Sequence, residues 1–144
     1  MIISLGADHG GYELKDKLAQ YLKEKGHQTI DNGTNSPDSV NYPDFGAAVA
    51  KDILEKRAEL GVLVCGSGIG ISISANRFKG IRAALVTCKE HAELSRQHNN
   101  ANIIALGGRF TTFDQAKEYL DIFLSTPFEG GRHENRINRI DELN

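Results

Sequence analysis

Apolar runs and amphipathic stretches alternate along the whole chain, and this alternation predicts the order of the structural elements. Short runs typical of strands occupy residues 2–7, 27–31, 61–65, 82–87 and 102–106. Stretches with apolar side chains every three or four positions, typical of amphipathic helices, cover residues 14–22, 45–53, 89–98 and 113–124. Strands and helices are therefore expected to follow one another in turn.

The stretch after Cys65 fits two patterns. Ile69, Ile71 and Ile73 alternate as in a strand, although Ile69 and Ile73 also share one face of a helix. We predict a helix, because parallel strands of one sheet need a crossover between them. The result is a Rossmann-like α/β fold, a three-layer α/β/α sandwich on a five-stranded parallel sheet. Ligands of such folds bind beyond the carboxyl ends of the strands.

One domain is expected over residues 1–144, because no linker, repeat or low-complexity segment divides the chain. Residues 125–144 are predicted to form a C-terminal tail with a short helix. Ile137, Ile140 and Leu143 share an apolar face of that helix. Such a face should dock on protein, either in this chain or in a partner subunit.

Charge and composition exclude several classes of protein. A net charge of −2 is too close to neutral for a general nucleic-acid binder. No apolar run approaches the about 20 residues that span a bilayer, and the N-terminus lacks a signal-peptide pattern. Two cysteines, Cys65 and Cys88, are too few for a disulfide framework. We expect a cytoplasmic protein without a nucleic-acid or membrane partner.

Cys65 ends the most apolar predicted strand and is followed by Gly66, Gly68 and Gly70. Backbone N–H groups in a glycine-rich turn before a helix bind anions, and the helix dipole favours negative charge there. The same surroundings favour a thiolate. A buried, inert cysteine is the alternative. The glycines favour a functional cysteine, because they imply that a ligand approaches the backbone closely.

The glycine loop does not match three well-known anion-binding loops. A dinucleotide fingerprint needs Gly-x-Gly-x-x-Gly, and a P-loop needs a lysine that this segment lacks. A cysteine phosphatase needs a basic residue where this chain has Ile71 and Ser72. The loop suits an anion without indicating one of those enzymes.

Histidines at two places in the chain could take part in chemistry. Asp8 and His9 end the first predicted strand, where the pair could transfer protons near neutral pH. A helix-capping Asp8 beside an exposed His9 is the alternative. His91 and His98 are too far apart for the usual i, i+4 metal pair, so no metal site is predicted.

The tail carries a basic face. Arg132, Arg136 and Arg139 recur at helical spacing, and arginines suit a phosphate because they form bidentate charge-assisted hydrogen bonds. The alternative is a solvated face on which Glu134 and Asp141 form ion pairs with the arginines.

Six short motifs follow one another over nearly the whole chain. They are Gly6-Ala7-Asp8-His9-Gly10-Gly11, Asp31-Asn32-Gly33-Thr34, Tyr42-Pro43, Cys65-Gly66-Ser67-Gly68-Ile69-Gly70-Ile71-Ser72, Ser95-Arg96-Gln97-His98-Asn99 and Glu129-Gly130-Gly131-Arg132-His133. In this order they resemble the ribose-5-phosphate isomerase type B family, which also includes galactose-6-phosphate and allose-6-phosphate isomerases. The motif at His98 and the tail motif favour the ribose enzyme.

The resemblance implies an aldose–ketose isomerase that interconverts D-ribose 5-phosphate and D-ribulose 5-phosphate through a cis-enediolate, without a metal or cofactor. The Cys65 thiolate would move a proton between C2 and C1 of the sugar, with help from Ser67. Asp8 would move protons between the two oxygens, and His98 would open the furanose ring. The backbone N–H groups implied to stabilise the enediolate belong to Gly66, Gly68, Ile69 and Gly70.

The resemblance also implies residues that hold the hydroxyls or the phosphate of the substrate. These are His9, Tyr42, Asn99, Arg109, Arg132, His133 and Arg136. Some would cross a subunit boundary, so a homodimer or tetramer with shared active sites is implied. Two alternatives stay open, an isomerase of a six-carbon sugar phosphate and a non-catalytic module that binds a phosphate or nucleotide.

Overall fold

Strands and helices alternate along the chain in the computed structural model, which describes residues 1–143. The strands are β1 (Ile2–Ala7), β2 (Gln28–Asp31), β3 (Leu60–Cys65), β4 (Ala83–Leu85) and β5 (Ile103–Gly107). The helices are α1 (Tyr12–Glu24), α2 (Tyr42–Leu54), α3 (Ile69–Asn76), α4 (Lys89–Gln97), α5 (Phe113–Ser125) and α6 (Arg132–Glu142). The predicted elements are confirmed, including the helix after Cys65. Asn144, the last residue of the predicted domain, lies outside the described residues.

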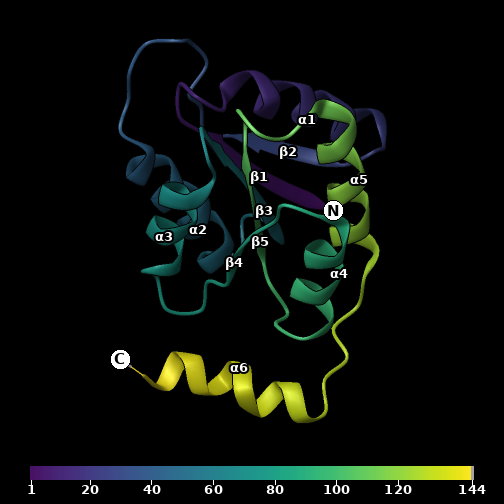
Figure 1. Cartoon of the computed structure of the whole chain (residues 1–144). Helices are drawn as coiled ribbons and strands as arrows, with labels where there is room; N and C mark the ends of the chain where they lie inside the picture. The colour runs from purple at the N-terminus through teal and green to yellow at the C-terminus, as the bar shows by residue number, and fades with distance from the viewer. Residues whose placement is uncertain (144) are drawn as a thin grey trace.

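The five strands form one parallel sheet in the order β2-β1-β3-β5-β4. Helices α1 and α5 cover one side of this sheet, and α2 and α3 cover the other (Figure 1). The predicted three-layer sandwich is therefore confirmed. Among residues 1–143, no helix is both long and apolar enough to cross a membrane.

Alternate residues of each central strand enter different cores. Val62 and Val64 of β3 are buried with side chains of α1, α4 and α5. Leu63 and Cys65 point the opposite way and are buried with side chains of α2 and α3. Both faces of β3 are thus covered, as the continuous apolar run predicts for a central parallel strand. Cys65 consequently reaches the end of the strand on the α2–α3 side.

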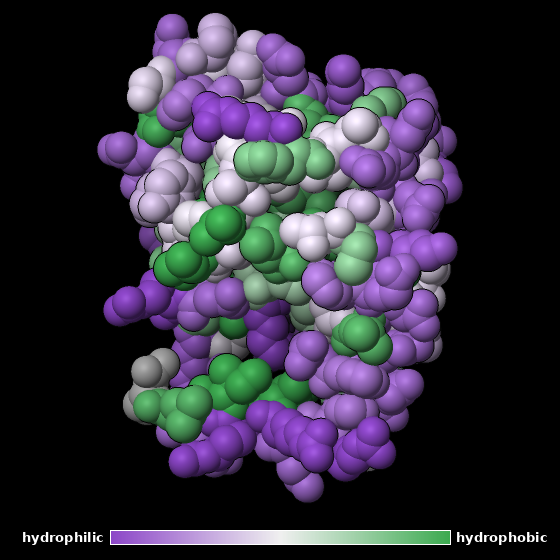
Figure 2. All heavy atoms as spheres, in the orientation of Figure 1, coloured by the Kyte–Doolittle hydropathy of each residue, from purple (hydrophilic) through white to green (hydrophobic). Residues whose placement is uncertain are grey.

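Helix α6 lies outside the sandwich (Figure 1). Of its predicted apolar face, Ile137 is buried, whereas Ile140 is 46% and Leu143 67% exposed. A hollow of about 370 Å³ separates this part of the helix from β4, with Ile140, Ala83 and Asn99 among its lining residues. Figure 2 shows apolar atoms of α6 turned toward the hollow. Within one chain, the predicted docking of this face is therefore confirmed only for Ile137.

A buried lysine joins α1 to the loop that follows β2. Lys15 is fully buried, and its Nζ donates hydrogen bonds to Oδ1 of Asp31 at 2.7 Å and Oδ1 of Asn35 at 2.9 Å. It also forms an ion pair with Asp16 at 2.9 Å. Asp31 accepts a further hydrogen bond from the N–H of Gly33, at 2.8 Å. Lys15 therefore holds the start of the loop that leads to α2.

The buried carboxylate of Asp52 also contacts the loop that follows β2, through Asn32. Asp52 accepts hydrogen bonds from Ser4 at 2.7 Å, and from Asn32 and Arg57 at 2.9 Å each. Burial alone would raise the pKa of Asp52, but the hydrogen bonds from Asn32, Ser4 and Arg57 outweigh it, so the pKa is lowered. Because the folded state favours the charged form, this group stabilises the fold above its ordinary pKa. That contribution is lost as the pH falls through the lowered value.

We expect Lys15→Ala to lower the free energy of unfolding by about 2–3 kcal/mol. This is less than most broken buried ion pairs cost, because the carboxylates of Asp16 and Asp31 are partly exposed. Urea unfolding followed by circular dichroism measures this change. Lys23→Ala, at an exposed position of the same helix, is the matched control and should change stability by less than about 1 kcal/mol. Equal losses in the two variants would contradict the anchoring role of Lys15.

Candidate active site

The segments that follow β1, β3 and β5 meet at one edge of the sheet. Ala7 is paired with Val64, and Cys65 with Gly107, so the three strands end at nearly the same level. The loops then bond to one another. The N–H of Gly108 donates to the carbonyl oxygen of Cys65 at 2.8 Å, and the N–H of Asp8 donates to the carbonyl oxygen of Val64 at 3.2 Å. Residues distant in sequence are thereby held next to one another.

The thiol of Cys65 faces the first turn of α3. Its side chain is buried, and its Sγ accepts a hydrogen bond from the N–H of Gly68 at 3.1 Å. Gly68 has φ = +80° as the N-cap residue of α3. A side chain there would also meet the backbone of Leu106, 2.8 Å from the position of its Cβ. Gly68 is therefore needed to direct an N–H group and the N-terminal end of α3 at the sulfur.

Two other glycines of the loop make room for side chains of this same chain. A Cβ on Gly66 would lie 2.9 Å from Nη1 of Arg109, and a Cβ on Gly70 would lie 2.6 Å from Cζ of Tyr42. Arg109 and Tyr42 therefore occupy the space that the missing Cβ atoms leave. The approach of a ligand to this loop, predicted from the same glycines, stays a prediction. Both predicted substrate-binding side chains thus lie against the loop that starts at Cys65.

Not every predicted oxyanion donor is available. The N–H of Gly68 is bonded to the thiol, and the N–H of Ile69 donates to Oγ of Ser67 at 3.1 Å. Among the described residues, the N–H groups of Gly66 and Gly70 have no hydrogen-bond partner. An oxygen anion at this loop would therefore meet the N–H groups of Gly66 and Gly70 without displacing an existing bond.

Asp8 and His9 lie beside this loop. Asp8 is buried, and its Oδ1 accepts the N–H of Gly10 at 2.8 Å. It does not cap α1, whose N-cap residue is Gly11. A Cβ on Gly10 would lie 3.1 Å from the nitrogen of Gly66 and 3.4 Å from Oδ1 of Asp8. The carboxylate and the glycine loop are therefore close neighbours.

His9 is oriented by a main-chain hydrogen bond. Its Nδ1 accepts the N–H of Val40 at 3.2 Å, so Nε2 of the neutral ring carries the proton and can donate. His9 and Arg109 line one pocket of about 300 Å³, together with Gly108 and Glu13. This pocket combines two donors suited to an anion at the edge where parallel sheets bind ligands.

The remaining predicted residues lie elsewhere in the chain. Helix α4 starts after β4 and runs back along the sheet, so His98, its C-cap residue, approaches the opposite edge. The carbonyl oxygen of Asn99 accepts from Arg82, which precedes β4. The six residues of β3 separate the two edges, which amounts to about 17 Å at about 3.3 Å per residue. One chain therefore does not bring His98 and Asn99 to Cys65.

His98 is instead paired with the tail. Its ring stacks on that of His133, with centroids 4.3 Å apart and an angle of 14° between the planes. His133 is buried, and its pKa is lowered, first by burial and then by the charges of His98 and Arg132. Glu129 lies beside both rings, with Oε1 3.7 Å from Nε2 of His98 and 3.4 Å from Nε2 of His133. Glu129 belongs to the same tail motif as His133, but the sequence did not pair it with His98, because only folding brings the end of α4 to the tail.

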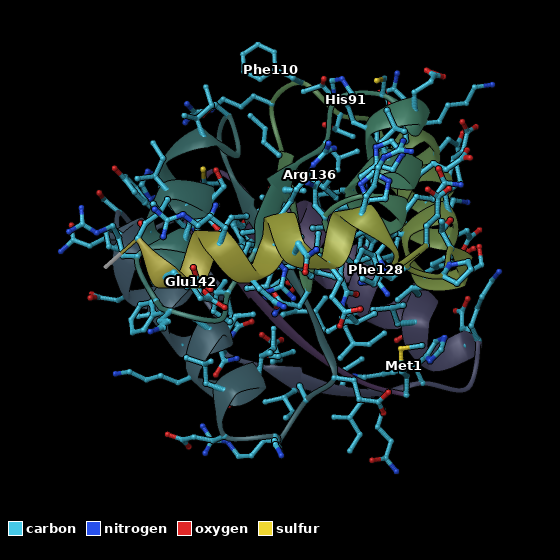
Figure 3. All side chains as sticks on the ribbon, turned by 90° about the horizontal axis from the view of Figure 1, so that it is seen from below. Met1, His91, Phe110, Phe128, Arg136 and Glu142 are labelled. Carbon is cyan, nitrogen blue, oxygen red and sulfur yellow. The ribbon has the colours of Figure 1, made fainter. Side chains whose placement is uncertain are left out.

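The arginines of α6 are exposed and lie on the same helix as His133. Among residues 1–143, no ion pair involves Arg132 or Arg136. Asp141, considered above as a partner, instead accepts the N–H of Gly80 at 3.0 Å. In Figure 3, seen from below, α6 with Arg136 runs across the front of the molecule, outside the sandwich. These arginines are therefore available to an anion.

The predicted residues thus form two groups. The first, the thiol half-site, comprises Asp8, His9, Tyr42, Cys65, Gly66, Ser67, Gly68, Ile69, Gly70 and Arg109. The second, the histidine half-site, comprises His98, Asn99, Arg132, His133 and Arg136. The thiol half-site has a buried thiol beside two backbone N–H groups without a partner among the described residues. The histidine half-site has two stacked imidazole rings and, within residues 1–143, two arginines outside any ion pair.

Comparison with known proteins relates the whole chain to one family. A model of the family described as Ribose/Galactose Isomerase matches residues 3–140. Ribose-5-phosphate isomerase B of Escherichia coli is 41% identical over 141 residues, which cover 98% of this chain and 95% of that protein. The galactose-6-phosphate isomerase subunit LacB of Clostridium acetobutylicum is 44% identical over 144 residues, which cover 99% of this chain and 83% of that protein.

Solved structures agree with this relation. A ribose 5-phosphate isomerase of Thermotoga maritima has a TM-score of 0.97 at 50% identity, covering 99% of this chain and 98% of that one. Ribose-5-phosphate isomerase B of Mycoplasma genitalium, solved with bound ribulose-5-phosphate, has a TM-score of 0.94 at 40% identity. That comparison covers 98% of this chain and 94% of the Mycoplasma chain.

Proposed function

Because the chain belongs to the ribose/galactose isomerase family, we propose that its reaction interconverts D-ribose 5-phosphate and D-ribulose 5-phosphate. The chain is a sugar-phosphate isomerase, as its relatives are, and the non-catalytic binding module is therefore set aside. The main support for a five-carbon substrate comes from the Mycoplasma relative, which was solved with bound ribulose-5-phosphate. That comparison covers 98% of this chain. The predicted cytoplasmic location and lack of a nucleic-acid partner stay predictions.

Cys65 is the proposed base. Its thiolate removes the proton from C2 of the open-chain aldose and returns it at C1, while the electron pair of the broken C–H bond forms the enediolate. Support comes from the Gly68 N–H, which donates to Sγ at 3.1 Å and stabilises a negative sulfur. The enediolate oxygens would be bound by the N–H groups of Gly66 and Gly70. Ser67 and Asp8 adjoin this loop and would move protons to and from the sugar oxygens.

The histidine half-site is proposed to act in the active site of a partner subunit. His98 would open the furanose ring, and Arg132, Arg136 and His133 would bind the phosphate together with His9 and Arg109 of the other chain. About 17 Å of sheet lies between the two half-sites within one chain. A second copy of the chain that places its histidine half-site against this thiol half-site would bring all the proposed residues into one active site.

Exposed apolar side chains border both half-sites and support this association. Ile69 of the thiol half-site and Ile73, on the same helix α3, are 51% and 59% exposed, and Ile140 and Leu143 of α6 are also exposed. Figure 2 shows apolar atoms gathered on the face that α3 presents. Contiguous exposed apolar surface of this kind marks sites of protein association. We therefore propose a homodimer, or a tetramer built from such dimers, with shared active sites.

The principal alternative is an isomerase of a six-carbon sugar phosphate. The 44% identity to the galactose-6-phosphate isomerase subunit favours it, and allose 6-phosphate belongs to the same class. We expect turnover of ribose 5-phosphate to exceed that of galactose 6-phosphate and allose 6-phosphate by at least about 10-fold in kcat/KM, because differences in pocket contacts of 1–3 kcal/mol give about 10–200-fold discrimination. Parallel assays of the three substrates measure this ratio. A higher kcat/KM on either six-carbon substrate would contradict the ribose assignment.

Cys65→Ala should lower kcat by about 10²–10⁴-fold, the usual contribution of a positioned base. Binding of ribose 5-phosphate should survive, because the phosphate contacts do not involve the thiol. Steady-state kinetics and ligand-induced thermal stabilisation measure the two effects separately. Cys88→Ala is the matched control, since this second thiol belongs to the N-cap residue of α4 and makes no side-chain capping bond. Wild-type kcat in Cys65→Ala would contradict the proposed base.

The shared site can be tested by mixing two inactive variants. We expect Cys65→Ala and His98→Ala to have little activity alone, yet to recover about one quarter of wild-type activity after subunit exchange at equal amounts. Half of the dimers are then mixed, and each mixed dimer contains one site with native Cys65 and native His98. Mixing Cys65→Ala with the double variant Cys65→Ala/His98→Ala is the control and should recover nothing. No recovery from the first mixture, with exchange verified by mass spectrometry, would contradict shared sites.

A further inference from the structure

Three potential metal ligands converge where α4 ends and α6 begins. The side-chain ligand atoms of His98, Glu129 and His133 all lie within 4.8 Å of one another. Oε1 of Glu129 faces both rings, 3.7 Å from Nε2 of His98 and 3.4 Å from Nε2 of His133. Glu129 and His133 are four residues apart in the tail, and the fold brings His98, at the end of α4, next to them.

Two of the three distances between these ligand atoms approach those of a tetrahedral metal site, and the ligand atoms of the two histidines lie no more than 4.8 Å apart. With bonds of about 2.0–2.1 Å to nitrogen and oxygen, ligand atoms of one zinc ion lie about 3.3 Å apart. The carboxylate oxygen is already within 0.4 Å of that separation from both nitrogens, as the distances of 3.7 and 3.4 Å show. Two imidazoles and one carboxylate also form a common ligand set for zinc, with a fourth position left to water.

The three side chains differ in how freely they can adjust. His133 is 8% exposed in its side chain and is held by its surroundings, whereas His98 is 39% and Glu129 50% exposed. The rings are nearly parallel, so a metal would require the His98 ring to turn until its Nε2 lone pair points to the ion. The positive charges of Arg132 and Arg136 oppose a cation and should limit the affinity.

We propose that His98, Glu129 and His133 form a binding site for a divalent transition metal such as Zn²⁺. Binding would occupy Nε2 of His98, and, if His98 has the role proposed above, the metal inhibits the enzyme by preventing ring opening. This second step rests on the proposed function, whereas the metal site rests on the three ligands alone. Metal binding and inhibition are therefore measured separately.

Metal binding is measured by titrating Zn²⁺ into tag-free protein in a calorimeter. Because thiolates also bind zinc, the Cys65→Ala variant serves as the background. In that background, we expect Glu129→Gln and His133→Ala each to weaken Zn²⁺ binding by at least about 10-fold. Glu134→Gln, on an exposed position one residue beyond His133, is the matched control and should leave the affinity unchanged. Equal affinity in all four proteins, or no Zn²⁺ binding in the background protein, would overturn the site.

Inhibition is measured with native Cys65 present, each protein being compared with its own rate in a metal chelator. We expect Glu129→Gln to require about 10-fold more Zn²⁺ for half-inhibition than the wild type or Glu134→Gln. Addition of the chelator should restore the rate. Equal inhibition of all three proteins would mean that zinc inhibits by binding the Cys65 thiolate. That result would overturn inhibition through His98. Tight binding without inhibition would overturn that step as well and would contradict the role of His98, while the metal site itself would stand.

Discussion

The parallel hydrogen bonding of β3 with β1 and β5 is the constraint on which the rest of the molecule depends. Parallel strands start at one edge of a sheet and end at the other, so every crossover helix must carry the chain back. Residues after β1, β3 and β5 consequently share the carboxyl edge, whereas the end of α4 returns to the amino edge. The separation of Cys65 from His98 is thus a consequence of the fold. A reaction that needs both residues requires another chain.

At the carboxyl edge, the absence of side chains matters as much as their presence. Gly68 allows the positive φ that directs an N–H group at the thiol, and Gly66 and Gly70 admit Arg109 and Tyr42. In the proposed reaction, the donors of a loop packed this tightly would meet an anion without having to move. Such preorganisation is what makes fixed dipoles effective in stabilising developing charge. The buried Lys15 and Asp52 serve the same end, since they hold the loop that leads to Tyr42.

The sequence predicted the fold well because the signals for it are local. Apolar periodicity indicates each element, and the need for a crossover decided that residues 69–76 form a helix. Contacts made by folding were harder to foresee. Lys15 lies in an amphipathic helix, where a lysine normally faces water, and only the partners Asp31 and Asn35 explain its burial. Glu129 could not be paired with His98 either, because the contact joins segments separated by α5 and by the path of the tail.

The division into two half-sites has a thermodynamic consequence for the proposed dimer. Arg132 and Arg136 are exposed, and a sugar phosphate bound between the subunits would contact these arginines in one chain and the thiol half-site in the other. A ligand that binds only the associated form stabilises that form by mass action. By linkage, association raises the affinity for substrate by the same factor. Substrate binding and subunit association are then thermodynamically coupled. The coupling follows from the fold, because the sheet keeps Cys65 and His98 of one chain apart and the substrate must contact two chains.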